Sequence, residues 1–96
     1  MSDSNEIIYE ESFRKDVRAL PGALQDALAS LIEILREDLF DPRLHTKPLG
    51  PPLQGLFSFR ITRGYRVGFV LSGPHTVRLL MVDTRENIYR RLRRKR

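Results

Sequence analysis

The chain has 96 residues, a formal net charge of +5 and 41% hydrophobic residues, a size that predicts one domain with a modest core and no deep private pocket. It contains no cysteine, which excludes a disulfide framework and a thiolate metal site. It lacks an apolar run of the about 18 residues that span a bilayer, and its acidic start lacks the apolar stretch of a signal peptide, so the expected compartment is the cytoplasm.

Charge is distributed unevenly along the chain. Residues 1–42 contain ten acidic and four basic residues, whereas residues 43–96 contain two acidic and thirteen basic residues. The first part therefore has a net charge of −6 and the second a net charge of +11. This segregation predicts a polyanionic partner for the second part. The alternative is a basic tail that only keeps the protein in solution, because residues 85–96 alone carry seven basic residues and one acid.

The first predicted elements are a short strand and a helical hairpin. Glu6–Tyr9 is β-prone, and Ser12 is placed to cap a helix after it. A second helix is predicted to begin at Pro21-Gly22 and to end near Asp38, because proline is tolerated in the first turn of a helix. The two helices share one buried side. Their apolar residues recur at helical spacing: Phe13, Val17, Leu20, Leu24, Leu28, Leu31, Ile32, Leu35 and Leu39.

Asp41-Pro42 ends the second helix, and a loop rich in proline and glycine follows, with a short extended piece around residues 44–47. Residues 56–71 then predict a β-hairpin with Arg63-Gly64 as its turn, where glycine can supply a positive φ. The apolar face of the hairpin alternates with a face that carries Arg60 and Arg66. The apolar face consists of Phe57, Phe59, Ile61, Tyr65, Val67, Phe69 and Leu71.

A third strand is predicted over Thr76–Val82, after a turn at residues 72–75. Val77, Leu79 and Met81 are expected to face one side, and Arg78, Leu80 and Val82 the other. Asp83 or Thr84 can cap a last helix, which Ile88 and Leu92 would anchor to the sheet.

The order of elements predicts an α+β fold. An N-terminal strand, a helical hairpin, a three-stranded antiparallel meander and a C-terminal helix follow one another, with the helices on one face of a mostly antiparallel sheet. We expect residues 1–96 to form one domain in which 1–5 and 93–96 are flexible, because the final RRKR run is too charged to pack.

Few residues offer recognisable chemistry. There is no zinc or calcium motif and no phosphate-binding glycine loop. His45 and His75 both lie in turn-like segments, without a serine or carboxylate at a telling spacing. What remains is a set of arginines and one tyrosine.

This set consists of Arg60, Arg66, Arg85 and Tyr89, with Lys47 nearby in sequence. Arg85 opens the last helix and Tyr89 follows one turn later on the same side. Together they could surround a phosphodiester and support metal-free RNA cleavage by the RNA's own 2′-OH. Arginine stabilises phosphate charge but is a poor proton donor. Tyr89 is the most credible proton-transfer group, although it could equally pack its ring on the sheet edge, and Arg60 and Arg66 could be ordinary solvated strand residues.

The motifs in the second half resemble those of the RelE/ParE superfamily of toxins from bacterial type II toxin–antitoxin pairs. The matching features are Lys47, Leu49, Leu53 and Gly55, then Arg60, then Gly64, Tyr65 and Arg66, and finally Arg85, Ile88, Tyr89 and Arg90. With the upstream helical hairpin, the resemblance covers residues 7–92.

The RelE branch of this superfamily implies a cytoplasmic endoribonuclease that cuts mRNA in the ribosomal A site without a metal or cofactor and is held inactive by a cognate antitoxin protein. The implied catalytic residues are Arg60, Arg66, Arg85 and Tyr89. We expect RNA contacts from Lys47, Arg63, Arg78, Arg90 and Arg91. Two positions depart from many relatives, which have a histidine where Thr84 stands and a basic residue where Ser58 stands.

Two other functions stay open. The ParE branch implies inhibition of DNA gyrase without a nuclease reaction. The third interpretation is a basic module that binds RNA or the ribosome and has no catalytic activity. It is compatible with Ser58 and Thr84, which stand where many relatives have a basic residue and a histidine.

Overall fold

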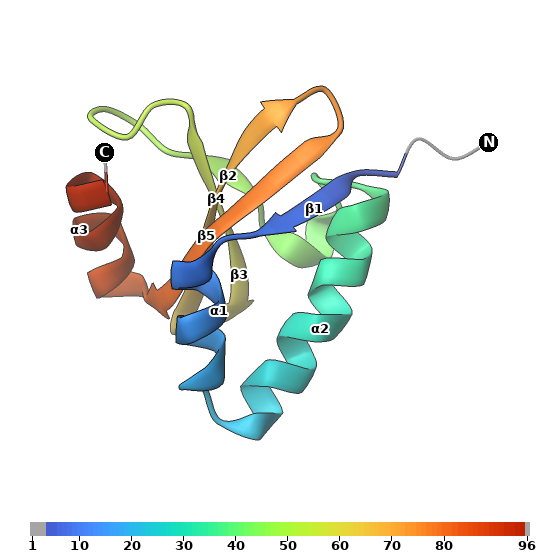
Figure 1. Ribbon diagram of the computed structural model, residues 1–96, viewed down its shortest axis with the longest axis vertical. Coiled ribbons are helices and arrows are strands. Elements are labelled where there is room, and N and C mark those ends of the chain that lie inside the picture. Colours follow the sequence, from blue (N-terminus) through green and yellow to red (C-terminus); the bar gives the residue numbers. More distant parts are fainter. Residues whose placement is uncertain (1–3, 96) are drawn as a thin grey trace.

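The computed structural model describes residues 4–95, which form a five-stranded sheet with three α-helices (Figure 1). The order of the main elements agrees with the sequence prediction. The helices are α1 (Glu11–Arg18), α2 (Gly22–Glu37) and α3 (Arg85–Lys95), with a 3₁₀ turn η1 (Pro42–Leu44). The strands are β1 (Glu6–Tyr9), β2 (Lys47–Pro48), β3 (Leu56–Thr62), β4 (Tyr65–Gly73) and β5 (Thr76–Thr84).

The strands are arranged in the order β1-β5-β4-β3-β2. β3, β4 and β5 form the predicted antiparallel meander, and β2 adds a short antiparallel edge to β3. β1 pairs in parallel with β5, from which it is separated along the chain by the helical hairpin and by β2, β3 and β4. The fold is therefore α+β with a mostly antiparallel sheet, as predicted.

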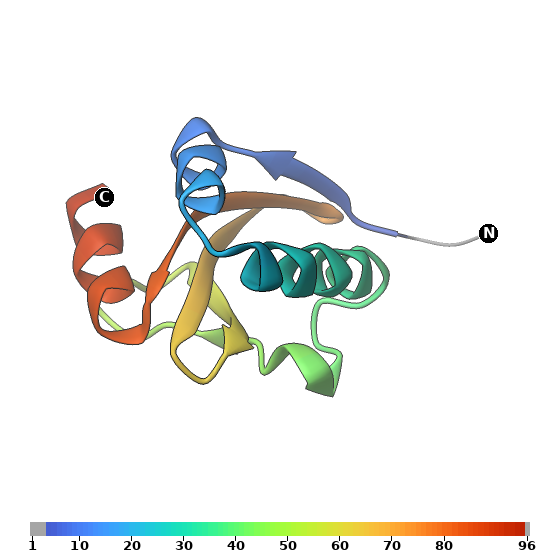
Figure 2. The ribbon, with the colours of Figure 1, turned by 90° about the horizontal axis from the view of Figure 1, so that it is seen from below.

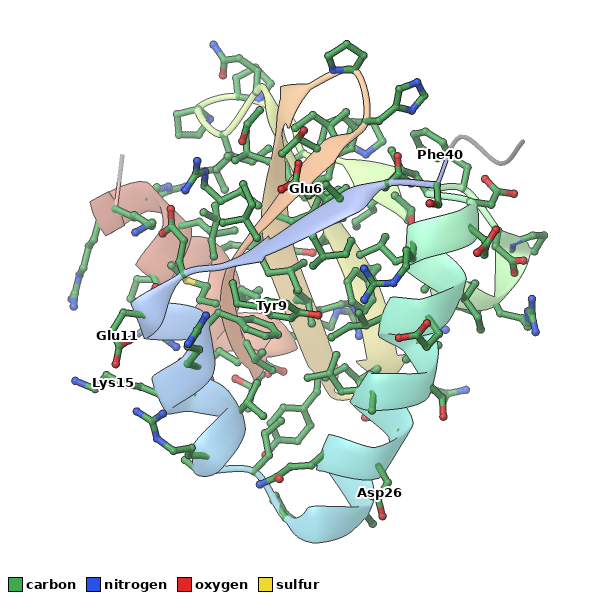
Figure 3. All side chains as sticks on the ribbon, turned by 45° about the vertical axis from the view of Figure 1, so that its right-hand side comes forward. Glu6, Tyr9, Glu11, Lys15, Asp26 and Phe40 are labelled. Carbon is green, nitrogen blue, oxygen red and sulfur yellow. The ribbon has the colours of Figure 1, made fainter. Side chains whose placement is uncertain are left out.

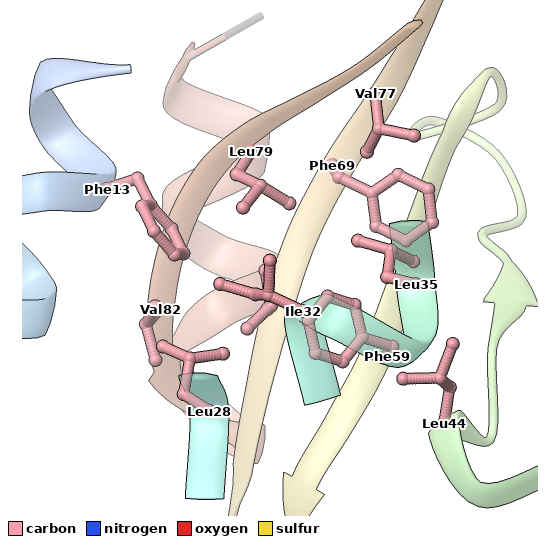
Figure 4. Close-up of a cluster of buried hydrophobic side chains, with 11 residues drawn as sticks. Phe13, Leu28, Ile32, Leu35, Leu44, Phe59, Phe69, Val77, Leu79 and Val82 are labelled. Atoms are coloured by element: carbon pink, nitrogen blue, oxygen red, sulfur yellow. The ribbon is translucent and has the colours of Figure 1, made fainter. Parts of the chain in front are cut away.

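One face of the sheet is covered by α1 and α2. Their apolar stripes pack on alternate residues of β3, β4 and β5 and form the larger core cluster (Figure 4). Tyr9 lies between the two helices, with its ring centroid 5.9 Å from that of Phe13 (Figure 3). Exposed residues such as Glu11, Lys15 and Asp26 lie on the outer sides of the helices. The buried members of the cluster are Phe13, Leu28, Ile32, Leu35, Leu44, Phe59, Val67, Phe69, Val77, Leu79 and Val82.

The opposite face is covered by α3 and the loop before β3 (Figure 2). This differs from the expectation that all helices share one face. Ile88 and Leu92 of α3 are fully buried in a second cluster, and Gly68 of β4 leaves the space that Leu92 fills. A Cβ atom at position 68 would stand 3.0 Å from Leu92 Cδ2. The other members of this cluster are Leu49, Leu53, Leu56, Leu80 and Met81.

A β-bulge in β5 corrects the predicted alternation of that strand. Gly68 pairs with Met81, and Phe69 pairs with Leu79, so Leu80 is an extra residue without its own partner. Alternation therefore restarts after the bulge. Met81 joins Leu80 in the second cluster and Val82 joins the first, the reverse of the predicted faces.

The helix ends differ in part from the prediction. Ser12 lies inside α1 and does not cap it; its hydroxyl donates to the Leu80 carbonyl oxygen and ties α1 to β5. The predicted cap of α3 is confirmed at Thr84, whose Oγ1 accepts from the Asn87 N–H at 3.2 Å. Gly64 does not use a positive φ; among the described glycines only Gly55 does, with φ of 94°.

The described residues at both ends of the chain make contacts with the rest of the protein, and the flexibility expected of residues 1–5 and 93–96 stays a prediction. Residues 93–95 continue α3, and Lys95 Nζ lies 3.0 Å from Glu10 Oε1. Asn5 is buried, and its N–H donates to the Arg36 carbonyl oxygen at 2.7 Å. Positions 1–3 and 96 lie outside the described residues. Within residues 4–95, none of the helices has the length and apolar character needed to cross a membrane.

Candidate functional site

The predicted arginines and tyrosine meet on the α3 face of the sheet. Arg60 of β3 and Arg66 of β4 are paired neighbours in the antiparallel register. α3 begins directly after β5, and the N–H of its first residue, Arg85, donates to the Gly64 carbonyl oxygen at 2.9 Å. This hydrogen bond fixes the start of α3 beside the β3–β4 turn. Residues from three segments are thereby brought together.

Arg66 is the buried member of the group, with 7% of its surface exposed. Its Nη1 donates to the carbonyl oxygens of Thr62 at 3.0 Å and Arg63 at 2.8 Å. Burial lowers the pKa of Arg66, and the positive charges of Arg60 and Arg85 lower it further, while Tyr89 acts in the opposite direction. The four side chains are therefore within electrostatic reach of one another, and Arg66 also holds the turn together.

Arg60 has an unsatisfied donor. Its Nε is buried and has no hydrogen-bond partner within residues 4–95. A buried donor without a partner is unfavourable by about 1–3 kcal/mol. The described residues thus supply no acceptor for Arg60 Nε.

Tyr89 is half-buried on α3 and packs against the second core cluster. Lys47 Nζ lies 5.9 Å from the centroid of its ring, a cation–π contact. The ring therefore packs on the protein, as one interpretation of Tyr89 predicted, whereas its role in proton transfer stays a prediction.

Within residues 4–95, the basic side chains of this site form no ion pair with a carboxylate. The ion pairs of residues 4–95 involve Arg18, Arg36, Arg43, Arg78, Arg91 and Lys95. None of those pairs includes Arg60, Arg66, Arg85 or Lys47. Like charges gathered without counter-ions create a strong local positive potential. We call Arg60, Arg66, Arg85 and Tyr89 the arginine–tyrosine cluster.

The residues expected to contact RNA fall into two groups. Arg63 is exposed in the β3–β4 turn, Lys47 contacts Tyr89, and exposed Arg90 donates to Asn87 Oδ1 at 3.1 Å. Arg78 and Arg91, by contrast, are held by carboxylates. Their partners are Glu10 for Arg78, and Asp16 and Asp83 for Arg91.

A pocket adjoins the cluster and includes a residue that the sequence analysis missed. It has a volume of about 290 Å³ and lies between residues 47–53 and α3, with Tyr89 and Arg93 on the helix side. Arg93 follows Tyr89 by four residues, and this spacing could have predicted that the two side chains lie on the same side of the helix. The sequence analysis missed Arg93 because it interpreted the whole run RRKR as one solvated tail.

The two departures from the family pattern have structural explanations. Thr84 uses its hydroxyl to cap α3. Ser58 is 1% exposed and lies between Lys47 of β2 and Gly68 of β4 in the sheet register. Neither side chain adds an acid or base to the arginine–tyrosine cluster.

The histidines lie in the turns where they were expected. His45 follows η1 with a positive φ of 52°, and the His75 carbonyl oxygen accepts from the Glu6 N–H at 2.6 Å. Across residues 4–95, His, Asp and Glu side chains form no group of three that could hold a metal ion.

The chemistry available here is the binding of a phosphodiester. Guanidinium groups bind phosphate oxygens in a bidentate way and stabilise added negative charge. The hydroxyl of Tyr89 can donate or accept a proton.

Solved structures with the same architecture are toxins of toxin–antitoxin systems. The toxin–antitoxin complex RelBE2 from Mycobacterium tuberculosis contains a chain that is 28% identical over 85% of this chain and 92% of its own length, with a TM-score of 0.72. The YoeB/ParE toxin from Agrobacterium tumefaciens is 18% identical over 82% of this chain and 96% of its own, with a TM-score of 0.72. YafQ from E. coli is 17% identical over 88% of this chain and 98% of its own length, with a TM-score of 0.73.

Comparison with protein-family models and with curated protein sequences gave no match. The resemblance predicted from the sequence motifs is nevertheless confirmed by structure, and the chain has the RelE-like fold shared by RelE, YoeB, YafQ and ParE toxins of toxin–antitoxin systems.

Proposed function

We propose that this protein is the toxin of a type II toxin–antitoxin pair and that it cleaves mRNA on the ribosome as a metal-independent endoribonuclease. The observation that carries the proposal is the arginine–tyrosine cluster. Three guanidinium groups gather there without an ion-paired carboxylate among residues 4–95, and one of them has a buried, unsatisfied Nε. Uncompensated positive charge of this kind is what a scissile phosphate requires.

In the proposed reaction the 2′ oxygen of the RNA attacks the adjacent phosphorus, and the bond from phosphorus to the 5′ oxygen breaks. Arg60 and Arg85 bind the non-bridging oxygens and stabilise the charge that develops on them. Arg66 fixes the β3–β4 turn and adds a third positive charge to the cluster. Tyr89 donates a proton to the departing 5′ oxygen and regains one from solvent. The products are a 2′,3′-cyclic phosphate and a free 5′-OH.

The cluster offers no carboxylate or imidazole to accept the 2′-OH proton, which passes to water. A site with so little base catalysis depends on how well its substrate is held in line. This supports a role for the ribosome, which would fix the mRNA in the reactive geometry. We therefore expect slow cleavage of free RNA and faster cleavage of translated mRNA.

The proposed protein partner is a small acidic antitoxin. The net charge of +11 in residues 43–96 favours an acidic partner, and the similar M. tuberculosis structure is itself a toxin–antitoxin complex. Co-expression with an acidic protein encoded next to this chain should yield a complex that co-purifies. Failure of every neighbouring acidic protein to bind would contradict this part of the proposal.

The experiment that tests the nuclease is induced expression in a bacterium, with primer extension on a translated reporter mRNA. Arg85→Ala is the informative variant, because Arg85 is exposed and its side chain forms no ion pair within residues 4–95. Arg94→Ala removes the same charge from another exposed position of α3 and is the matched control.

We expect growth arrest and new 5′ ends within codons for the unaltered chain and Arg94→Ala, and strong reduction of both for Arg85→Ala. Growth arrest with intact mRNA and inhibited DNA supercoiling would contradict the nuclease proposal and favour inhibition of DNA gyrase. Absence of arrest, with RNA binding retained, would leave a binding module without chemistry.

A further inference from the structure

Phe40 is an exposed aromatic side chain that is held in a fixed position beyond the end of α2 (Figure 3). Among residues 4–95 it is the large hydrophobic side chain that stays exposed, at 58%. Its N–H donates to Asp38 Oδ1 at 3.0 Å, and the Thr46 hydroxyl donates to the Leu39 carbonyl oxygen at 2.6 Å, so hydrogen bonds close the surrounding loop. The ring also meets that of Phe57 edge-on, with centroids 6.4 Å apart. Rigid aromatic side chains of this kind are typical anchors of protein interfaces.

Two carboxylates directly precede this aromatic side chain. Glu37 is the last residue of α2, and Asp38 follows it as the C-cap. Both are exposed, and neither forms an ion pair within residues 4–95. The negative end of the helix dipole disfavours carboxylates here, so the charges at these two positions do not stabilise α2. An apolar anchor with a negative rim is complementary to an apolar hollow with a positive rim.

A hollow of that kind lies on the same chain, in the pocket beside Tyr89. Lys47 and Arg93 line it, are exposed and form no ion pair within residues 4–95. The pocket has a volume of about 290 Å³. A cavity of about 150 Å³ holds a benzene molecule, so the pocket has room for the ring of Phe40. Its apolar wall consists of Pro48, Leu49, Pro51, Pro52 and Leu53.

Phe40 does not face the pocket of its own chain. Phe57, against which it packs, belongs to the core cluster on the α1–α2 face of the sheet. The pocket lies on the α3 face, where Leu49 and Leu53 join the second core cluster. The anchor and the hollow can therefore meet only between two copies of the chain. Such a contact joins unlike surfaces, so it continues from copy to copy unless the rotation between copies closes a ring.

We propose that copies of this chain associate head to tail, with Phe40 of one copy in the pocket beside Tyr89 of the next. The carboxylates of Glu37 and Asp38 then meet the cations at the rim of that pocket. The net charges of −6 in residues 1–42 and +11 in residues 43–96 favour this contact over a symmetric contact of two like-charged faces. Because Tyr89 belongs to the arginine–tyrosine cluster, each associated copy covers the cluster of its neighbour.

Sedimentation velocity over a range of protein concentrations tests the association. For the unaltered chain at low salt we expect an average mass that rises with concentration beyond that of a dimer, and a smaller mass at high salt, because salt screens the charged rim. Phe40→Ala should weaken the association about tenfold or more, the effect of truncating an interface anchor. The double substitution Lys47→Glu with Arg93→Glu should also weaken it. All three side chains are exposed, so both variants should keep the fold, which far-UV circular dichroism checks.

An equal mixture of the two variants distinguishes a head-to-tail contact from a symmetric one. The Phe40→Ala chain keeps its pocket and the double variant keeps its Phe40, so the mixture should form a dimer and stop there, although each variant alone stays monomeric.

The control is Lys15→Glu with Arg94→Glu, which reverses two charges at exposed positions outside the pocket and should associate like the unaltered chain. A chain that is monomeric at every concentration would overturn the proposal and leave the pocket to another ligand. Association that Phe40→Ala retains, a mixture that stays monomeric, or an equal loss of association in the control would overturn it as well. None of these outcomes depends on whether the protein cleaves mRNA.

Discussion

Arg91 of α3 and Asp16 of α1 are 75 residues apart in the chain, and Arg91 Nη1 lies 3.0 Å from Asp16 Oδ2. The same nitrogen lies 3.0 Å from Asp83 Oδ2, and Asp16 Oδ2 also accepts from the Val82 N–H at 2.9 Å. One guanidinium thus joins α1, the end of β5 and α3. This clamp positions the helix that carries Arg85 and Tyr89.

Removal of the clamp should destabilise the fold. Asp16→Ala leaves the Val82 N–H without its acceptor and removes one of the two carboxylates that pair with Arg91, so we expect a loss of about 1–3 kcal/mol in the free energy of unfolding. Urea denaturation measures it. Asp26→Ala changes an exposed carboxylate of α2 and should stay within about 0.5 kcal/mol. Equal effects of the two substitutions would show that the clamp contributes nothing.

Stability should fall in acid through Asp83. Burial alone would raise the pKa of Asp83, but hydrogen bonds from the Thr84 N–H, Arg91 and Asn87 outweigh it and hold the pKa below its usual range. The unfolded chain therefore binds the proton more readily. The stabilisation is present above the unfolded-state pKa of about 3.9 and is lost as pH falls through the folded-state value.

Urea midpoints at pH 7, 4 and 3 test this dependence. Asp83→Asn should be less stable than the unaltered protein at pH 7, and the difference should shrink toward pH 3. Asp26→Asn controls for the loss of one charge. A difference that stays constant from pH 7 to pH 3 would contradict the role assigned to the ionised carboxylate.

Two arginines of the cluster should behave differently on substitution. Arg66→Ala removes the hydrogen bonds to the Thr62 and Arg63 carbonyl oxygens, so it should lower stability by at least about 1 kcal/mol as well as activity. Arg85→Ala should lower activity with stability within about 0.5 kcal/mol, because its side chain is exposed. Thermal unfolding and mRNA cleavage, measured on both variants, separate the two roles. Identical stability of the two variants would show that Arg66 does not hold the turn.

Tyr89→Phe should reduce mRNA cleavage by about 10²-fold or more, the contribution typical of general acid catalysis, while RNA affinity stays within about twofold. The ring and its packing are preserved, so loss of the hydroxyl alone is measured. Tyr65→Phe removes a hydroxyl from a tyrosine in the separate depression formed with Asp16 and Arg91, and it should cleave normally. Full activity of Tyr89→Phe would remove Tyr89 from the proposed proton transfer.

Gly68→Ala should weaken the packing of α3 on the sheet. The added Cβ would lie 3.0 Å from Leu92 Cδ2 and 3.1 Å from Cδ1, and Leu92 is fully buried and has little room to move. We expect a loss of about 1 kcal/mol or more. Gly73→Ala, whose Cβ would come no closer than 3.5 Å to Thr76, is the control and should be near neutral in the same denaturation measurement. A neutral result at position 68 would mean that Leu92 adjusts freely.

The amino-acid sequence was sufficient for the main elements and for the set of residues that the structure brings together in the arginine–tyrosine cluster. Helical spacing placed α1 and α2, alternation placed the β3–β4 hairpin, and Thr84 marked the start of α3. These features are local, because periodicity and capping depend on residues within one or two turns of each other. The direct pairing of Arg60 with Arg66 does not follow from the two-residue turn, because regular pairing would place Ile61 opposite Arg66; a register shift between Arg60 and Thr62 brings the two arginines opposite each other.

The tertiary structure decided which face and which partner each element has. Ile88 and Leu92 indicate that α3 has an apolar side, but their spacing does not say which face of the sheet that side covers. In the structure α3 packs on the face where Gly68, which lacks a side chain, leaves space for Leu92. In the same way, thirteen basic residues look alike in the second part of the chain. Carboxylates distant in sequence neutralise Arg78 and Arg91, whereas the arginine–tyrosine cluster stays uncompensated, because charge pairing depends on proximity in space and not on position along the chain.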